Sequence, residues 1–266
     1  MRLKISHTTR YEYDQPVPYG LQQLRLTPAS GATQRVIDWS LNLGTARQES
    51  AFRDQHGNEV RLVSLPPDTR SIEIVSTGEV ETTDTAGVSG PHTGAAPLWY
   101  YRRQTGRTRP GPVLNKLLKT FPGDHKDAIE SLHALMTHVA EAVDYDTDTT
   151  HAETTAEIAA KAGSGVCQDH AHIFIGLARA LGHPARYVSG YLKMDGQRHQ
   201  DASHAWSDVH IEGLGWVGFD VSNRISPDTR YVRIATGLDY AEAAPISGFV
   251  FGGGEESMMV TLQIQQ

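Results

Sequence analysis

Residues 165–192 read GVCQDHAHIFIGLARALGHPARYVSGYL, and the apolar spacing in this stretch predicts a buried helix followed by a strand. The apolar residues that share one helical face are Ile173, Phe174, Leu177 and Leu181. Gly182 and Pro184 are typical of the end of such a helix. Cys167 comes before the apolar stripe, so we expect it in the first turn of the helix and outside the hydrophobic core.

Cys167 is the single cysteine of the chain, which excludes an internal disulfide and a zinc or iron–sulfur site built from several cysteines. At the start of a helix, the free backbone amides and the helix dipole favour negative charge, so both favour the reactive thiolate. Gly163 and Gly165 permit a ligand to approach the backbone closely. The alternative is an inert thiol packed in the core, which the position of Cys167 before the stripe disfavours.

Residues 203–223 read SHAWSDVHIEGLGWVGFDVSN, which predicts two strands joined by a glycine-rich turn. If the two strands pair, His204 and Asp220 lie side by side at the open end of the hairpin. We expect Cys167 to face His204 there, which gives a nucleophile, a base and an orienting carboxylate. Spacing alone leaves two alternatives: His204 as an ordinary strand histidine, and Asp220 as the cap of the turn that follows it.

Two further groups of polar residues have simpler interpretations. Asp208 and His210 fit the nucleophile–base arrangement poorly, and we expect them to form a surface pair. His170 and His172 are two residues apart and therefore do not share a helix face. We expect neither a metal site nor a cofactor.

The first part of the chain has the pattern of β-strands. Apolar and polar residues alternate with a period of two from Leu3 to Tyr13, and helical periodicity begins only after residue 110. A helix is expected to begin at Asp124. Residues 81–97 have the composition of a linker. We expect an α+β fold with a sandwich-like all-β domain over residues 1–97, and a second domain with helices and C-terminal strands over residues 98–266.

Composition restricts the partners of the protein. The chain has 266 residues, a net charge of −7 and a pI near 6.0. This acidic balance disfavours binding to nucleic acid or to anionic membranes. No apolar run is long enough to cross a bilayer, and the stretch MRLKISHTTRYEYDQ lacks the apolar segment of a signal peptide. We therefore expect a cytoplasmic protein without nucleic-acid or membrane partners.

The two quoted blocks resemble the transglutaminase-like superfamily. Residues 165–192 resemble its nucleophile helix and the strand that follows, and residues 203–223 resemble its histidine and aspartate strands. The resemblance extends over residues 110–225. More loosely, RYEYDQPV at residues 10–17 resembles the β-rich N-terminal region of bacterial members. The resemblance implies a papain-like core with helices on an antiparallel sheet, without a cofactor. It also implies Cys167 as nucleophile, His204 as base and Asp220 as the residue that orients the base.

The chemistry implied by this resemblance is acyl transfer at an amide bond of a peptide or another amide substrate. Water as acceptor makes the protein a cysteine peptidase or amidase, whereas an amine as acceptor makes it a transglutaminase. A third possibility is a catalytically silent module that binds a protein or peptide. We take the hydrolase as the leading hypothesis, and no feature of the sequence decides between hydrolysis and transamidation. The sequence also leaves open the substrate, the second donor to the oxyanion and the oligomeric state.

Overall fold

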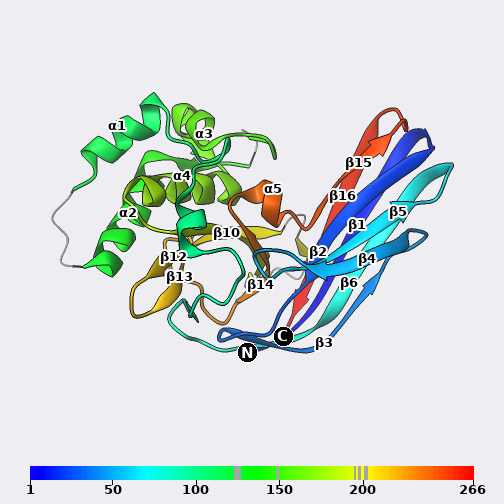
Figure 1. Ribbon diagram of the computed structural model, residues 1–266, viewed down its shortest axis with the longest axis horizontal. Coiled ribbons are helices and arrows are strands. Elements are labelled where there is room, and N and C mark those ends of the chain that lie inside the picture. Colours follow the sequence, from blue (N-terminus) through cyan, green and yellow to red (C-terminus); the bar gives the residue numbers. More distant parts are fainter. Residues whose placement is uncertain (123–126, 148–149, 195, 197–198, 201–202) are drawn as a thin grey trace.

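The structure is a computed structural model that describes residues 1–122, 127–147, 150–194, 196, 199–200 and 203–266. Figure 1 shows a group of helices over one sheet, and long strands that extend from this group on the opposite side of the molecule. Within the described ranges, no helix is long and apolar enough to span a membrane.

The long strands form two antiparallel sheets. The long sheet has the order β11–β16–β1–β6–β3 and consists of β1 (Arg2–Val17), β3 (Gln34–Asn42), β6 (Thr69–Thr82), β11 (His199–Gln200) and β16 (Glu256–Gln265). The short sheet has the order β15–β2–β5–β4 and consists of β2 (Tyr19–Thr27), β4 (Arg47–Arg53), β5 (Glu59–Leu65) and β15 (Ile246–Phe251). Tyr11, Leu24 and Val63 belong to a buried cluster between the two sheets. This packing confirms the predicted β-rich N-terminal region.

Two strands from the end of the sequence complete these sheets. β16 pairs with β1 in a continuous antiparallel register from Lys4–Gln265 to Tyr13–Glu256. β15 pairs with β2 at the edge of the short sheet. The red C-terminal strands therefore lie among the blue N-terminal ones in Figure 1. The expected division of the chain at residue 97 stays a prediction, and the structure adds that residues 246–265 lie in the N-terminal sheets.

The remainder of the chain forms helices over a third antiparallel sheet, called here the core sheet. Its order is β14–β10–β12–β13–β7, and its strands are β7 (Val88–Gly90), β10 (Ala185–Leu192), β12 (His204–Ile211), β13 (Gly215–Phe219) and β14 (Tyr231–Gly237). The helices are η1 (Leu98–Arg102), α1 (Pro112–Thr120), α2 (Ala128–Ala142), α3 (Ala156–Ala162), α4 (Cys167–Ala180) and α5 (Tyr240–Ala243). A short parallel pair, β8 (Asp144–Tyr145) and β9 (Ser164–Gly165), precedes α4.

Helix α4 is the predicted buried helix, and it packs against β12 of the core sheet. Phe174 and Phe219 are in contact in the centre of this layer, with ring centroids 5.3 Å apart. The helix-on-sheet arrangement confirms the expected α+β fold. Helix α2 is capped by the side chain of Asp127, which accepts a hydrogen bond from the amide of Glu130. Asp124, the expected start of that helix, lies outside the described residues.

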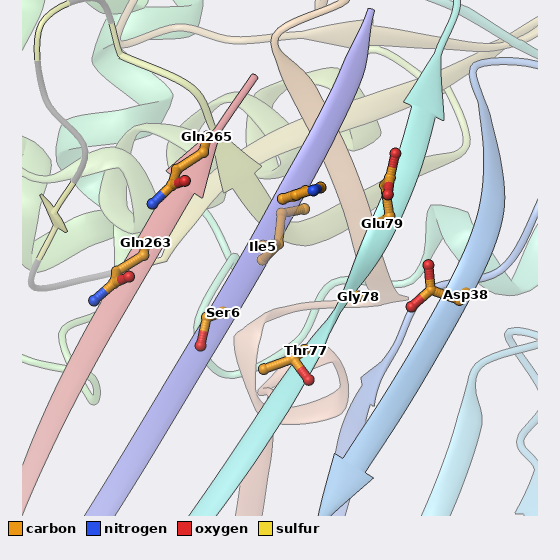
Figure 2. Close-up of a pocket in the computed structure, with 9 residues that line it drawn as sticks. Ile5, Ser6, Asp38, Thr77, Gly78, Glu79, Gln263 and Gln265 are labelled. Atoms are coloured by element: carbon orange, nitrogen blue, oxygen red, sulfur yellow. The ribbon is translucent and has the colours of Figure 1, made fainter.

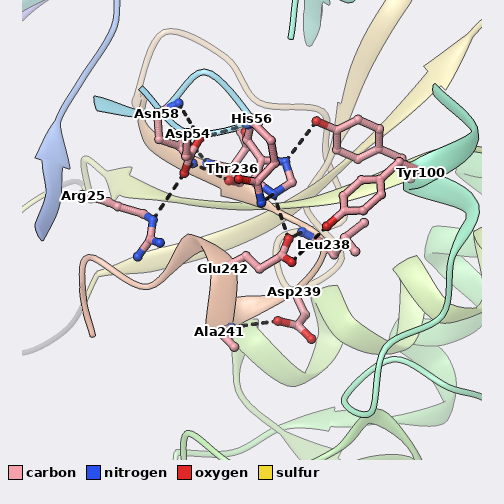
Figure 3. A network of polar contacts seen from close by, with 12 residues as sticks. Arg25, Asp54, His56, Asn58, Tyr100, Thr236, Leu238, Asp239, Ala241 and Glu242 are labelled. Atoms are coloured by element: carbon pink, nitrogen blue, oxygen red, sulfur yellow. Dashed lines mark hydrogen bonds and ion pairs between the residues drawn. The ribbon is translucent and has the colours of Figure 1, made fainter. Parts of the chain in front are cut away.

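A turn between β4 and β5 connects the short sheet to the core sheet (Figure 3). His56 in this turn contacts the Tyr101 hydroxyl through Nδ1 at 3.0 Å and the Glu242 carboxylate through Nε2 at 2.8 Å. The Asn58 amide donates to the carbonyl of Thr236 on β14 at 2.7 Å and accepts from its backbone N–H at 2.8 Å. The turn therefore supplies hydrogen-bond partners to backbone groups at the edge of the core sheet. These bonds fix the position of the short sheet relative to the core sheet.

Asn58→Ala should destabilise the whole protein, because it leaves the buried backbone N–H and C=O of Thr236 without partners. We expect a loss of about 2–4 kcal/mol in the free energy of unfolding, measured by urea denaturation. Asn115→Ala, at an exposed position of α1, is the matched control and should change stability by less than about 0.5 kcal/mol. Equal effects of the two substitutions would contradict this assignment.

Candidate active site

Cys167 is the first residue of α4, and its side chain is partly exposed. The amide of Val166, just before the helix, donates to Oδ2 of Asp169 at 2.9 Å. The same oxygen accepts from the Thr150 hydroxyl at 2.7 Å. Burial raises the pKa of Asp169, although both hydrogen bonds oppose the shift. Asp169 thus closes the start of the helix.

The hairpin of β12 and β13 brings His204 and Asp220 together. Ser207 pairs with Phe219, so His204 and Asp220 both lie at the open end, as expected. Nε2 of His204 lies 2.6 Å from Oδ2 of Asp220, and Cys167 interacts with the same imidazole. The structure therefore places all three expected residues in contact, in the order cysteine, histidine, aspartate.

Asp220 is completely buried and has four hydrogen bonds to neighbouring groups. Besides His204, its Oδ2 accepts from the Tyr231 hydroxyl and from the side-chain amide of Asn223, both at 2.7 Å. Its Oδ1 accepts from the backbone N–H of Asn223 at 3.2 Å. Burial raises the pKa of Asp220, but the hydrogen bonds and the charge of His204 outweigh this effect and lower it. The alternative role of Asp220, as a cap of the following turn, is thus present alongside the contact to His204.

Sequence reasoning did not identify Asn223 and Tyr231 as members of this site. Asn223 lies in the quoted block, three residues after Asp220, where an aspartate–asparagine turn is a recognisable signal. Tyr231 comes from β14, which is separated from β12 by β10 in the sheet order. No local pattern of the sequence indicates this contact.

The environment of His204 favours its protonated form. Burial lowers the pKa of this imidazole, but the negative charge of Cys167 and the hydrogen bonds to Asp220 and Cys167 raise it to about 10. Trp206 stacks beside the ring at a centroid distance of 6.2 Å.

The other histidines have structural positions. His170 contacts the Ser222 hydroxyl through Nδ1 at 2.9 Å and the carbonyl of Val143 through Nε2 at 3.0 Å. His172 is completely buried, and burial lowers its pKa to about 3. Among the described residues, no group of three or more histidine, cysteine or acidic side chains is arranged to hold a metal ion.

The expectation of a surface pair between Asp208 and His210 is wrong. Asp208 is completely buried and forms ion pairs with Arg186 at 2.8 Å and with Arg233 at 2.7 Å. Burial raises the pKa of Asp208, but the two guanidinium groups outweigh it and lower the pKa. The partners lie on β10 and β14, so the ion pairs follow from the order of the strands and are invisible in the local sequence.

Two family models match the chain. Residues 115–221 match the transglutaminase-like superfamily, and residues 3–81 match the bacterial transglutaminase-like N-terminal region. Residues 115–221 therefore form a transglutaminase-like region, and the two matches together cover most of the chain. The matched core contains all three residues in contact at the site, and the matched N-terminal region contains most of the strands in the long and short sheets.

Relatives extend over nearly the whole length of this transglutaminase-like chain. An uncharacterized protein from Mycobacterium leprae is 27% identical over 276 residues, which covers 99% of this chain and 98% of the relative. An uncharacterized protein from Mycobacterium tuberculosis is 28% identical over 288 residues and covers 97% and 90%. The crystal structure of a candidate cysteine protease from Cytophaga hutchinsonii superposes with a TM-score of 0.78 at 24% identity, covering 100% of this chain and 90% of that one. This last similarity shows a shared fold.

A cavity of about 780 Å³ lies beside the cysteine and the histidine of the transglutaminase-like core. The core contributes Cys167, His204 and a group of tyrosines to its lining. The long sheet contributes residues from β1 and β16. The complete lining is His7, Thr9, Tyr11, Tyr145, Thr147, Val166, Cys167, Gln168, Tyr187, Ser189, Met194, Ser203, His204, Ala205, Tyr240, Pro245, Ile246, Met258 and Val260. The site is therefore accessible to a ligand of substantial size.

Cys167→Ala should lower the pKa of His204, because the negative charge that opposes the effect of burial is removed. The wild-type imidazole should titrate with a pKa of about 10, and the pKa of the imidazole in the variant should be about 1 to 3 units lower. Nitrogen-detected NMR of the imidazole between pH 5 and pH 11 measures the shift. Gln168→Ala removes the neighbouring side chain, which donates to the carbonyl of Ala152, and is the matched control. An unchanged titration of the His204 imidazole in Cys167→Ala would refute the contact between His204 and Cys167.

Proposed function

We propose that this protein is a cysteine hydrolase that cleaves amide bonds of peptides or related amides through a thioester intermediate. The observation that carries the proposal is the imidazole of His204, held between Cys167 and Asp220 at 2.6 Å from the carboxylate, beside a cavity of about 780 Å³. A thiolate–imidazolium pair of this kind is the form in which cysteine enzymes attack carbonyl groups.

In the first half of the reaction, the Cys167 thiolate attacks the carbonyl carbon of the amide, and the carbonyl oxygen becomes an oxyanion. The carbon–nitrogen bond then breaks, and His204 gives its proton to the leaving amine. In the second half, neutral His204 takes a proton from water, and the water oxygen attacks the thioester. The carbon–sulfur bond breaks, a carboxylic acid leaves and loses its proton to solvent, and the thiolate–imidazolium pair is restored. Asp220 keeps the ring oriented throughout.

The backbone amide of Cys167 is one donor to the oxyanion, and Tyr187 supplies the second. The ring of Tyr187 is buried, lines the cavity and packs on His172 with centroids 5.1 Å apart. Burial raises the pKa of Tyr187 well above its ordinary value, and the charge of Cys167 raises it further. The hydroxyl therefore keeps its proton close to the cysteine, which is the property that an oxyanion donor requires.

Cys167→Ala and His204→Ala should each reduce hydrolysis of peptidyl aminomethylcoumarin substrates to the uncatalysed background. The first removes the nucleophile, and the second removes the proton donor. His210→Ala, on the same strand as His204 and outside the site, is the matched control and should retain activity. A Cys167→Ala variant with undiminished turnover would refute the proposal.

The same assay separates the other two functions. Addition of dansylcadaverine tests the acyl acceptor, because a transglutaminase transfers the acyl group to this amine at the expense of hydrolysis. Absence of turnover with and without the amine, together with an alkylation rate of Cys167 no faster than that of free cysteine, would favour a silent binding module.

Tyr187→Phe should lower kcat/KM for amide hydrolysis by about 10²–10³-fold, the usual effect of removing one oxyanion donor. The rate of Cys167 alkylation by iodoacetamide should not change, because displacement of iodide develops no oxyanion. Tyr13→Phe, which removes a buried hydroxyl from the long sheet, is the control and should change neither rate. A parallel loss of hydrolysis and alkylation in Tyr187→Phe would show that Tyr187 supports only the structure of the site.

A further inference from the structure

The long sheet forms one wall of the cavity, opposite the start of α4. His7, Thr9 and Tyr11 of β1 line it together with Met258 and Val260 of β16. The register pairs Tyr11 with Met258 and Thr9 with Val260, so these side chains project from the same face of the sheet. This set of five residues is called here the β1–β16 wall.

The β1–β16 wall is uncharged. Its single titratable group near neutrality is His7, which contacts the Tyr191 hydroxyl through Nδ1 at 2.8 Å and the Thr9 hydroxyl through Nε2 at 3.1 Å. Burial lowers the pKa of His7 to about 4, so this ring is neutral at physiological pH. Of the described residues that line the cavity, none is an aspartate, glutamate, lysine or arginine.

The opposite face of the same sheet differs in character. There a hollow of about 440 Å³ is lined by polar and charged side chains that include Lys4, Asp38 and Glu79 (Figure 2). Arg10 and Glu12, which alternate with the wall residues along β1, form an ion pair at 2.8 Å on that side. Arg10 and Glu12 therefore point away from the cavity. Glu256 of β16 pairs with Tyr13 on the same face as the wall, beyond Met258, and it is not among the described residues that line the cavity.

We propose that the β1–β16 wall is a substrate-binding surface that selects an uncharged, apolar or aromatic side chain next to the reacting carbonyl, on the acyl side. The inference rests on the proposed function. After the amine has left, the acyl group remains attached to Cys167, so the cavity that contains the cysteine must accommodate it. Methionine, valine and tyrosine side chains favour apolar groups there, and the β1–β16 wall offers no opposite charge to a charged group that loses its hydration against it.

The test uses peptidyl vinyl sulfones that carry Leu, Phe, Asp or Lys next to the reactive group. The Cys167 thiolate adds to the vinyl carbon next to the amino-acid residue, and the proton of His204 moves to the vinyl carbon beside the sulfone. Labelling therefore depends on binding and on the thiolate, and is the same for a hydrolase and a transamidase. The Leu and Phe probes should label the protein about 100-fold faster than the Asp and Lys probes, a difference of about 2.7 kcal/mol.

Two adjacent methionines of β16 provide matched variants. Met258 belongs to the wall and Met259 projects from the opposite face, and their exposed fractions are 59% and 67%. Met258→Asp should raise the labelling rate of the Lys probe relative to the Leu probe about tenfold, because it places a carboxylate opposite the ammonium group. Met259→Asp should leave this ratio unchanged. Iodoacetamide alkylation of each variant reports the integrity of its thiolate site, and the ratio of the two probes within one variant cancels any change in thiolate reactivity.

The outcomes distinguish the inference from the function on which it rests. Equal labelling by all four probes, or equal changes of the ratio in the two methionine variants, would overturn the role of the wall and leave the proposed hydrolase intact. Labelling by iodoacetamide without labelling by any peptide probe would overturn both. Selective labelling by the Leu and Phe probes, with a switch only in Met258→Asp, is the result expected.

Discussion

The buried carboxylate of Asp220 is the constraint on which the site depends. An ionised carboxylate without partners in the protein interior costs several kcal/mol, and Asp220 avoids this cost through groups contributed by three segments. His204 comes from β12, Asn223 from the turn after β13, and Tyr231 from β14. The short contact of 2.6 Å to His204 is therefore one of several bonds that a displaced strand would break together. The hydrogen bonds that the buried Asp220 carboxylate requires therefore fix the position of the His204 ring, which faces Cys167.

A second buried carboxylate, Asp208, is linked to the His204 ring through Arg233 and Trp206. Asp208 holds Arg186 and Arg233 in the interior of the core sheet. The guanidinium of Arg233 lies over the ring of Trp206 at 5.6 Å, and Trp206 stacks beside His204. Removal of one partner from such a network leaves an uncompensated buried charge. Substitution of any one of these residues alone should therefore destabilise the protein. The orientation of His204 thus depends on two separate clusters, one around Asp220 and one around Asp208.

The sequence predicted what is encoded locally, and it could not predict contacts set by the order of strands. The apolar stripe of α4 and the hairpin that joins His204 to Asp220 were both recognisable, because helical periodicity and short antiparallel turns are local properties. Tyr231 and the ion pairs of Asp208 come from strands that are adjacent only after the core sheet has formed. C-terminal strands were expected, whereas the pairing of β16 with β1 joins segments from the two ends of the chain. The catalytic roles of the three residues remain predictions from resemblance and geometry.

The pairing of β1 with β16 affects the stage of folding at which the cavity beside Cys167 is completed. Contacts between residues as distant as Ile5 and Ile264 close the largest loop in the chain, and pairings of this kind form slowly. The helix α4 and its hairpin involve much shorter loops, so the reactive cysteine and its histidine can assemble during synthesis, before β16 has emerged from the ribosome. The thiol is then present in a nascent chain while one side of its cavity is still open to solvent. The proposed selective wall is therefore expected to form after the reactive pair that it serves.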